Sequence, residues 1–118
     1  MVEVRYRFTG RDLATIARNI GIAAAPEPAG VLDDIAVAAG HTDVQTAAGL
    51  LFTAVLAARP FPRDSIVFAV EASRTFLIAN GVRVARVLDP ERIFALVDAV
   101  REHALEDAAE IGKRLATL

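Results

Sequence analysis

Residues 44–58 constrain the fold more than any other stretch, because these 15 consecutive residues include no charged side chain. One glutamine and two threonines are the only members with polar side chains. A membrane-spanning helix needs about 18 or more apolar residues, so the stretch is too short to cross a bilayer. It therefore predicts a buried helix, and a helix that is apolar on nearly every face belongs at the centre of a bundle.

The remaining chain divides into further helices and two short extended segments. Apolar spacing and capping residues predict helices at about 9–20, 31–39, 63–80, 90–100 and 106–115. We expect Thr9, Thr42 and Asp89 as N-caps. Residues 2–8 alternate apolar and polar side chains, and residues 82–85 do so in part, so the two segments could pair as strands. The predicted fold is mainly α, a compact bundle of about six helices with a short two-stranded β element.

Composition narrows the classes of function. The 118 residues predict a single domain spanning 1–118. There is no cysteine for a disulfide or a thiolate metal site, and a net charge of −2 gives no basic surplus for nucleic acid. The first residues lack the apolar core of a secretory signal, so we expect a cytoplasmic protein that does not enter a membrane. Only Lys113 among the 13 lysines and arginines is a lysine, which suggests a bacterial genome rich in G and C.

The segment between the two most apolar helices carries a recognisable layout. It reads Arg59-Pro60-Phe61-Pro62-Arg63-Asp64-Ser65-Ile66-Val67, and the helix that follows ends in Phe76-Leu77 and then Asn80-Gly81. This layout resembles the signature region of the Doc (death-on-curing) branch of the Fic superfamily, where one buried helix precedes the motif and another continues it. The resemblance covers most of the chain. It implies a Fic/Doc-like helical domain, a toxin–antitoxin context and a small antitoxin-like partner.

The resemblance also implies what each motif residue should do. In the family a histidine, a phenylalanine, an acidic residue, an asparagine and an arginine occupy every second position. The histidine acts as base, the acidic residue binds magnesium, and the last two hold the phosphates of ATP. The corresponding residues in this chain are Arg59, Phe61, Arg63, Ser65 and Val67. Only Phe61, whose role in the family is structural, keeps the family residue.

The substituted positions cannot supply the family chemistry. Arginine stays protonated in proteins, so Arg59 cannot act as a base, and Arg63 is a cation where a metal would bind. Asp64 lies one residue further on and would point about 100° around a helix from the acidic position. We therefore predict no catalytic residue, no metal site and no cofactor. Arg59 and Arg63 could together bind an anion near the start of the second apolar helix, or form a solvated surface pair.

Three functions remain open from the sequence. The first is a Doc-like pseudoenzyme that has lost phosphoryl or nucleotidyl transfer and acts as a binding or scaffold module. The second is an active toxin that uses ATP and magnesium to transfer phosphate or AMP to a protein through non-standard residues such as Asp64, Ser65 and Arg59. The third is an unrelated helical dimerisation domain.

Several smaller expectations accompany these hypotheses. With 54% hydrophobic residues, the chain should leave apolar surface for a homodimer or an antitoxin-like partner, most of it on the N-terminal segment and the last helix. Glu71 and Arg74 are three residues apart and should form an ion pair, or else they should line the groove where the family has its active site. His41 and His103 lie far from the motif, and their spacing predicts no metal site.

Overall fold

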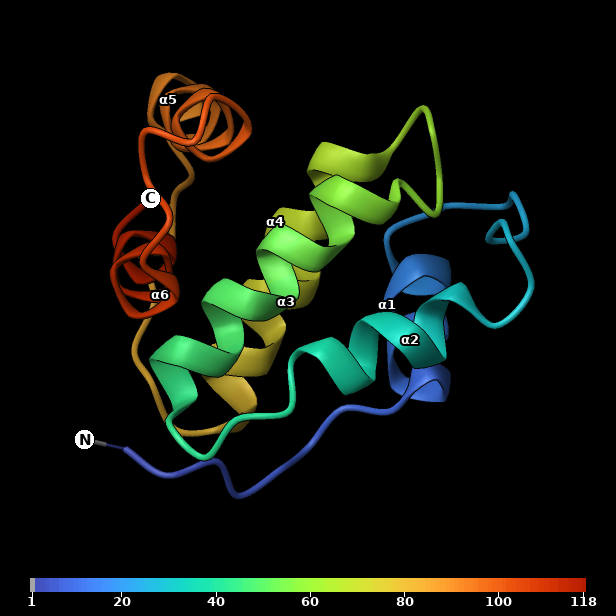
Figure 1. Cartoon of the computed structure of the whole chain (residues 1–118), viewed down its shortest axis with the longest axis horizontal. Coiled ribbons are helices and arrows are strands. Elements are labelled where there is room, and N and C mark those ends of the chain that lie inside the picture. Colours follow the sequence, from blue (N-terminus) through green and yellow to red (C-terminus); the bar gives the residue numbers. More distant parts are fainter. Residues whose placement is uncertain (1) are drawn as a thin grey trace.

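The two most apolar stretches form the central helices α3 (Val44–Ala58) and α4 (Ser65–Ala79). In the computed structural model, which describes residues 2–118, these helices lie side by side through the middle of the molecule (Figure 1). Five of their apolar side chains fill the core and are at most 3% exposed: Leu51, Val55, Phe68, Phe76 and Leu77. The prediction of two buried central helices is confirmed.

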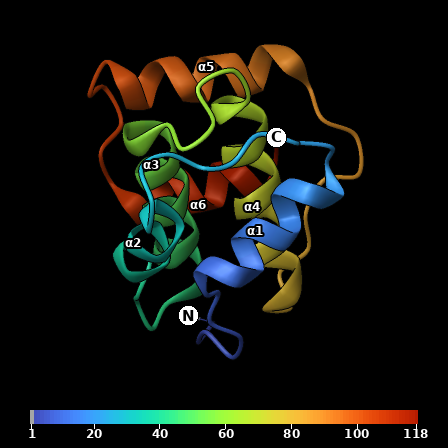
Figure 2. The same ribbon diagram turned by 90° about the vertical axis from the view of Figure 1, so that its right-hand side faces the viewer.

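Four further helices surround this pair. The helices α1 (Gly10–Asn19) and α2 (Val31–Ala38) lie on one side, and α5 (Pro90–Arg101) and α6 (Ala108–Ala116) lie on the other (Figure 1). Figure 2 shows α5 along the top of the molecule, above α3, α4 and α6. The predicted mainly-α bundle of about six helices is therefore confirmed. No helix in the described part of the chain combines the length and the apolar character of a membrane span.

The crossing of α3 and α6 depends on two glycines. A Cβ added at Gly49 would overlap the carbonyl oxygen of Ala108, and a Cβ added at Gly112 would overlap the carbonyl oxygen of Gln45. The backbones of the two helices therefore touch, which only glycine permits. Leu115 and Ile111 fill the core beside this crossing and are at most 1% exposed. The last helix was expected to leave apolar surface uncovered. That expectation is wrong, because α6 is part of the core.

Carboxylates cap several of the helices. Thr9 caps α1 as predicted, and together with Asp12 it forms a reciprocal capping box. Asp43, rather than the expected Thr42, caps α3 by accepting from the backbone N–H of Thr46 at 3.0 Å. Asp89 and Asp107 cap α5 and α6 in the same way. Helix α6 thus begins two residues later than predicted, because Asp107 is its cap rather than its interior.

The two predicted strands do not pair with each other. Val4 donates its N–H to the carbonyl of Thr42 at 2.8 Å, and Val2 accepts from Val44 at 2.9 Å, which leaves a single antiparallel bridge between Glu3 and Asp43. Within residues 2–118 there is no sheet. The segment 82–85 is coil. Its Ala85 donates its N–H at 2.9 Å to the carbonyl of Ala116, which lies at the end of α6 and not in the N-terminal segment. Each segment forms its backbone hydrogen bonds with a part of the chain other than the predicted partner strand.

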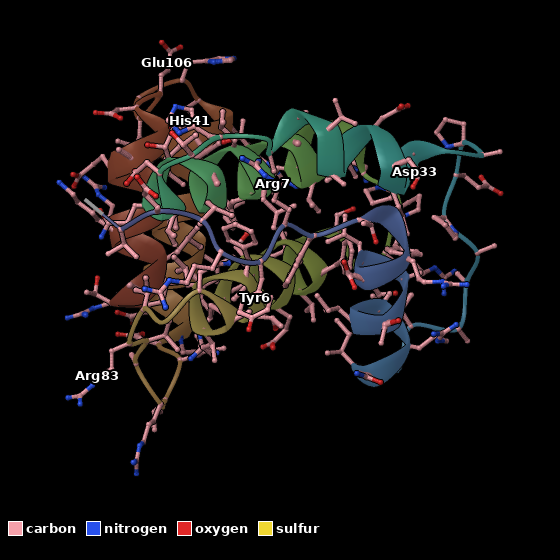
Figure 3. All side chains as sticks on the ribbon, turned by 90° about the horizontal axis from the view of Figure 1, so that it is seen from below. Tyr6, Arg7, Asp33, His41, Arg83 and Glu106 are labelled. Carbon is pink, nitrogen blue, oxygen red and sulfur yellow. The ribbon has the colours of Figure 1, made fainter. Side chains whose placement is uncertain are left out.

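Asn80 fixes the N-terminal segment to the end of α4. Its side-chain oxygen accepts from the backbone N–H groups of Arg5 and Tyr6 at 2.7 and 2.9 Å. Its amide nitrogen donates to the carbonyls of Tyr6 and Phe76 at 3.1 and 2.9 Å. The segment consequently runs across the underside of the bundle (Figure 3). The side chain of Asn80 is only 4% exposed, so it does more than end a helix.

Candidate functional site

The motif segment is the tight connection between α3 and α4. Arg59 ends α3 in the left-handed conformation, with φ of 47°, and its guanidinium donates to the carbonyl of Pro62 at 3.5 Å. Asp64 donates its backbone N–H to the carbonyl of Phe61 at 2.9 Å, which closes a turn. This turn delays the start of α4 to Ser65, two residues after the predicted start at Arg63.

Two residues of the motif anchor this connection in the core. Phe61 is 2% exposed and packs edge-to-face on Phe68, with ring centroids 5.0 Å apart. The hydroxyl of Ser65 is buried and donates to the carbonyl of Phe61 at 2.9 Å. Phe61 therefore has a packing role in this structure. Ser65 has the same kind of role, because its hydroxyl is already used in a local hydrogen bond.

Three arginines line a basic hollow at the motif. Its volume is about 270 Å³, and Arg59 and Arg63 from the motif meet Arg101 from the last turn of α5 there. The two residues expected to form an anion site are thus brought to one hollow. Arg101 was missed, since no sequence signal relates a residue of α5 to a motif some forty positions earlier. An arginine in the last turn of a helix is already explained by its favourable interaction with the helix dipole, so there was no reason in the sequence to assign Arg101 to a site.

The residues of the hollow do not fit the ATP and magnesium that the resemblance would imply. Its lining within residues 2–118 contains three guanidinium groups and no carboxylate, whereas magnesium requires oxygen ligands. Asp64 lies next to the hollow but is not among its lining residues. Val67, where the resemblance would imply a phosphate-binding arginine, is 54% exposed and carries only methyl groups. The site is suited to an anion but not to a metal.

An apolar groove continues from the basic hollow. It has a volume of about 240 Å³ and lies between α4 and α5, lined mainly by the apolar residues Ile66, Val67, Val70, Leu88, Ile93 and Phe94, with Glu71 also on its wall. Ile66 and Val67 line both the groove and the hollow, so the two form one surface. Phe94 is 56% exposed on this surface. We call the combined surface the α4/α5 face.

The other polar residues singled out from the sequence have structural partners. His41 accepts from the backbone N–H of Asp43 at 3.0 Å, and His103 pairs with Glu106 at 3.3 Å. No group of three or more metal-ligating side chains comes together in residues 2–118. The predicted ion pair between Glu71 and Arg74 is wrong. The guanidinium of Arg74 instead donates to the carbonyl of Ala85, because the coil after α4 folds back over it.

Comparison of the chain with protein-family models, with curated proteins and with solved structures finds no match. The class of protein that the fold defines is a mainly-α bundle, with six helices within residues 2–118.

Proposed function

We propose that this chain is a Doc-like binding module that has lost phosphoryl or nucleotidyl transfer. In this proposal its α4/α5 face holds an acidic, amphipathic segment of a partner protein. The observation that carries the proposal is the continuity of the basic hollow with the apolar groove at Ile66 and Val67. Arg59, Arg63 and Val67, three of the motif positions that would carry chemistry in the family, line this surface, which supports a binding role for it.

The apolar part of the face supplies the driving force for binding. Val67 and Phe94 are 54% and 56% exposed on either wall of the groove, and helix-in-groove recognition uses apolar anchors of this kind. Burying apolar surface contributes about 25 cal/mol per Å² removed from water. Aromatic residues such as Phe94 are typical of the positions that dominate binding energy at interfaces.

Within residues 2–118, three of the four charged side chains that line the face are arginines and the fourth is Glu71, so its charges favour an acidic partner over a second copy of this chain. A two-fold symmetric dimer uses the same patch on both subunits, so pairing through this face would bring Arg59, Arg63 and Arg101 of each copy into one interface. Like charges in an interface oppose association. An acidic side chain at one end of a partner helix would instead form charge-assisted hydrogen bonds with the arginines.

The binding role is tested with a labelled helical peptide that has leucines along one face and glutamates at one end. Fluorescence anisotropy should show saturable binding that weakens with salt, and Arg63→Glu should reduce the affinity at least about tenfold. Arg11→Glu, an exposed arginine on α1, is the matched control and should leave binding unchanged. Equal losses in both variants would mean that the peptide responds to overall charge and not to this face.

The loss of transfer chemistry is tested separately. Titration of ATP with magnesium should show no binding at micromolar concentration, and labelled nucleotide should not be transferred to protein substrates. The physical reason is that Arg63 and Val67 occupy the metal and phosphate positions. Stoichiometric transfer that disappears in Asp64→Ala would instead establish the active-toxin alternative.

Light scattering addresses the dimerisation alternative. The isolated protein should have a mass near 12.6 kDa. A stable dimer that becomes monomeric in Phe94→Glu would show that this face joins two copies of the chain and does not hold a foreign segment.

A further inference from the structure

A second cavity lies on the side of the molecule away from α5. It has a volume of about 360 Å³ and lies between the N-terminal segment, α2 and the central helices. Two core residues, Leu51 and Phe76, line it, and its other apolar lining residues are Val4, Phe8, Ala36, Val37 and Ala39. Ligand pockets range from about 300 to 1,000 Å³ and are predominantly apolar with a few polar groups. The cavity is therefore of the size that takes a small molecule.

Two charged side chains, Arg7 and Asp33, stand at this cavity, and their surroundings differ. Figure 3 shows Arg7 on the N-terminal segment and Asp33 beside the start of α1. Asp33 packs against Gly10 so closely that a Cβ there would overlap its carboxylate, and it also lies in the first turn of α2. The positive ends of two helices thus lie near this carboxylate and offset its charge.

The charge of Arg7 is not offset in this way by an oppositely charged group in the described part of the chain. Within residues 2–118 its guanidinium takes part in none of the ion pairs. The backbone that carries it is held in place, because Asn80 binds the preceding residues Arg5 and Tyr6. An exposed guanidinium at the rim of an apolar cavity matches a carboxylate in geometry and in charge.

We propose that this cavity binds a small carboxylic acid with a compact apolar body. The apolar body lies against Leu51 and Phe76, and the carboxylate accepts hydrogen bonds from the guanidinium of Arg7. The apolar contact supplies affinity, and the charged contact sets the orientation and selects acids over neutral molecules. This site is independent of the α4/α5 face and does not rest on the function proposed for that face.

Octanoate and octanol are the probes, since they share an alkyl chain and differ in charge. Titration calorimetry and amide chemical shifts on the whole chain should show one saturable octanoate site, with the shifts centred on Val4, Phe8 and Ala36. Octanol should bind at least about tenfold more weakly, because it forfeits the charge-assisted hydrogen bond. Shortening the acid from octanoate to hexanoate should weaken binding about threefold to fourfold per methylene removed.

Two variants and a control separate the charged contact from the apolar one. Arg7→Gln should weaken octanoate about tenfold and leave octanol within about twofold. Ala36→Phe should fill the cavity and abolish binding of both probes. Arg11→Gln removes an exposed arginine outside the cavity and should change neither affinity. Arg7 is exposed, so Arg7→Gln should leave the fold intact. This variant therefore tests the proposal even if Ala36→Phe does not fold.

Several results would overturn the proposal. Octanoate binding that does not saturate would remove the assigned site. The same holds if octanol binds as tightly as octanoate, or if Arg7→Gln and Arg11→Gln weaken octanoate binding equally. Amide shifts at the cavity that change with protein concentration in the absence of any probe would show a second copy covering it, and would also overturn the assignment.

Discussion

Helices α6 and α5 are neighbours in the sequence, but they pack against the core in different ways. Glycines at 49 and 112 let α6 approach α3 until the backbones touch. Helix α5 buries Leu96, Val97 and Val100 yet leaves the groove of about 240 Å³ between itself and α4. A contact between backbones fixes one geometry, whereas a contact through large side chains leaves room for repacking. The comparison indicates that α6 belongs to the fixed core and α5 to an adaptable face.

The largest expected effect breaks the α3–α6 crossing. Gly112→Ala should lower the free energy of unfolding by more than about 3 kcal/mol, because the new Cβ overlaps backbone and no rotamer change can relieve it. Urea unfolding measures the loss. Gly40→Ala is the control, since the nearest atom to its new Cβ is the carbonyl oxygen of Val37 at 3.1 Å, and it should cost below about 1 kcal/mol. Equal losses in the two variants would contradict the close crossing.

A matched pair of leucine truncations compares the two helices directly. Leu115 on α6 and Leu96 on α5 are 0% and 4% exposed. Leu115→Ala should cost about 3 kcal/mol or more and Leu96→Ala about 2 kcal/mol, because the surroundings of α5 can collapse further into the space left behind. Thermal and urea unfolding of both variants provide the comparison. A larger loss for Leu96→Ala would show that α5 is the more rigidly packed of the two helices.

The cap of α3 gives a smaller, pH-dependent effect. The backbone N–H of Thr46, and then its hydroxyl, hold the pKa of the Asp43 carboxyl below its ordinary value of 3.8. A group whose pKa falls on folding stabilises the fold above its unfolded pKa, and that contribution is lost as the pH falls through the lower, folded pKa. Asp43→Ala should cost about 1 kcal/mol at neutral pH.

The check on the cap is unfolding measured from pH 6 down to pH 2. The difference in stability between the wild type and Asp43→Ala should shrink at the acid end, because protonated Asp43 no longer acts as a charged cap. A difference that stays constant with pH would mean that the carboxylate charge does not contribute.

The smallest effect is expected at the exposed wall of the groove. Phe94→Asp should change the free energy of unfolding by less than about 0.5 kcal/mol, since the ring is 56% exposed and contributes little to the core. The same change should abolish binding of the acidic amphipathic peptide. A loss of stability comparable to that of Leu96→Ala would show that Phe94 serves the fold and not an interface.

The sequence predicted what depends on local signals. Residues 44–58 form a buried helix with the expected bounds, and Thr9 and Asp89 cap their helices because capping needs only residues a few positions apart. The pairing of the extended segments could not be predicted, since the true partners, Thr42 and Ala116, offer only backbone groups, which carry no sequence signal. The same holds for Arg101 in the basic hollow, whose position depends on how α5 crosses the bundle.

The structural roles of Gly49 and Asn80 could not be predicted from the sequence either. Gly49 lies in the uncharged stretch, where any small residue fits the pattern, and only the position of α6 reveals why glycine is needed there. Asn80-Gly81 is a common helix stop, so nothing distinguished an asparagine that makes long-range bonds from one that merely ends a helix. Both roles concern contacts between segments far apart in the chain.

The bonds from Asn80 have a consequence for the order of folding. They join residue 80 to residues 5 and 6, at sequence separations of 75 and 74, and closing a loop of that length has a large entropic cost. We therefore expect the N-terminal segment to dock after α4 has formed, since its partner Asn80 follows the end of that helix. Until that segment docks, the cavity that contains Leu51 and Phe76 lacks one of its walls.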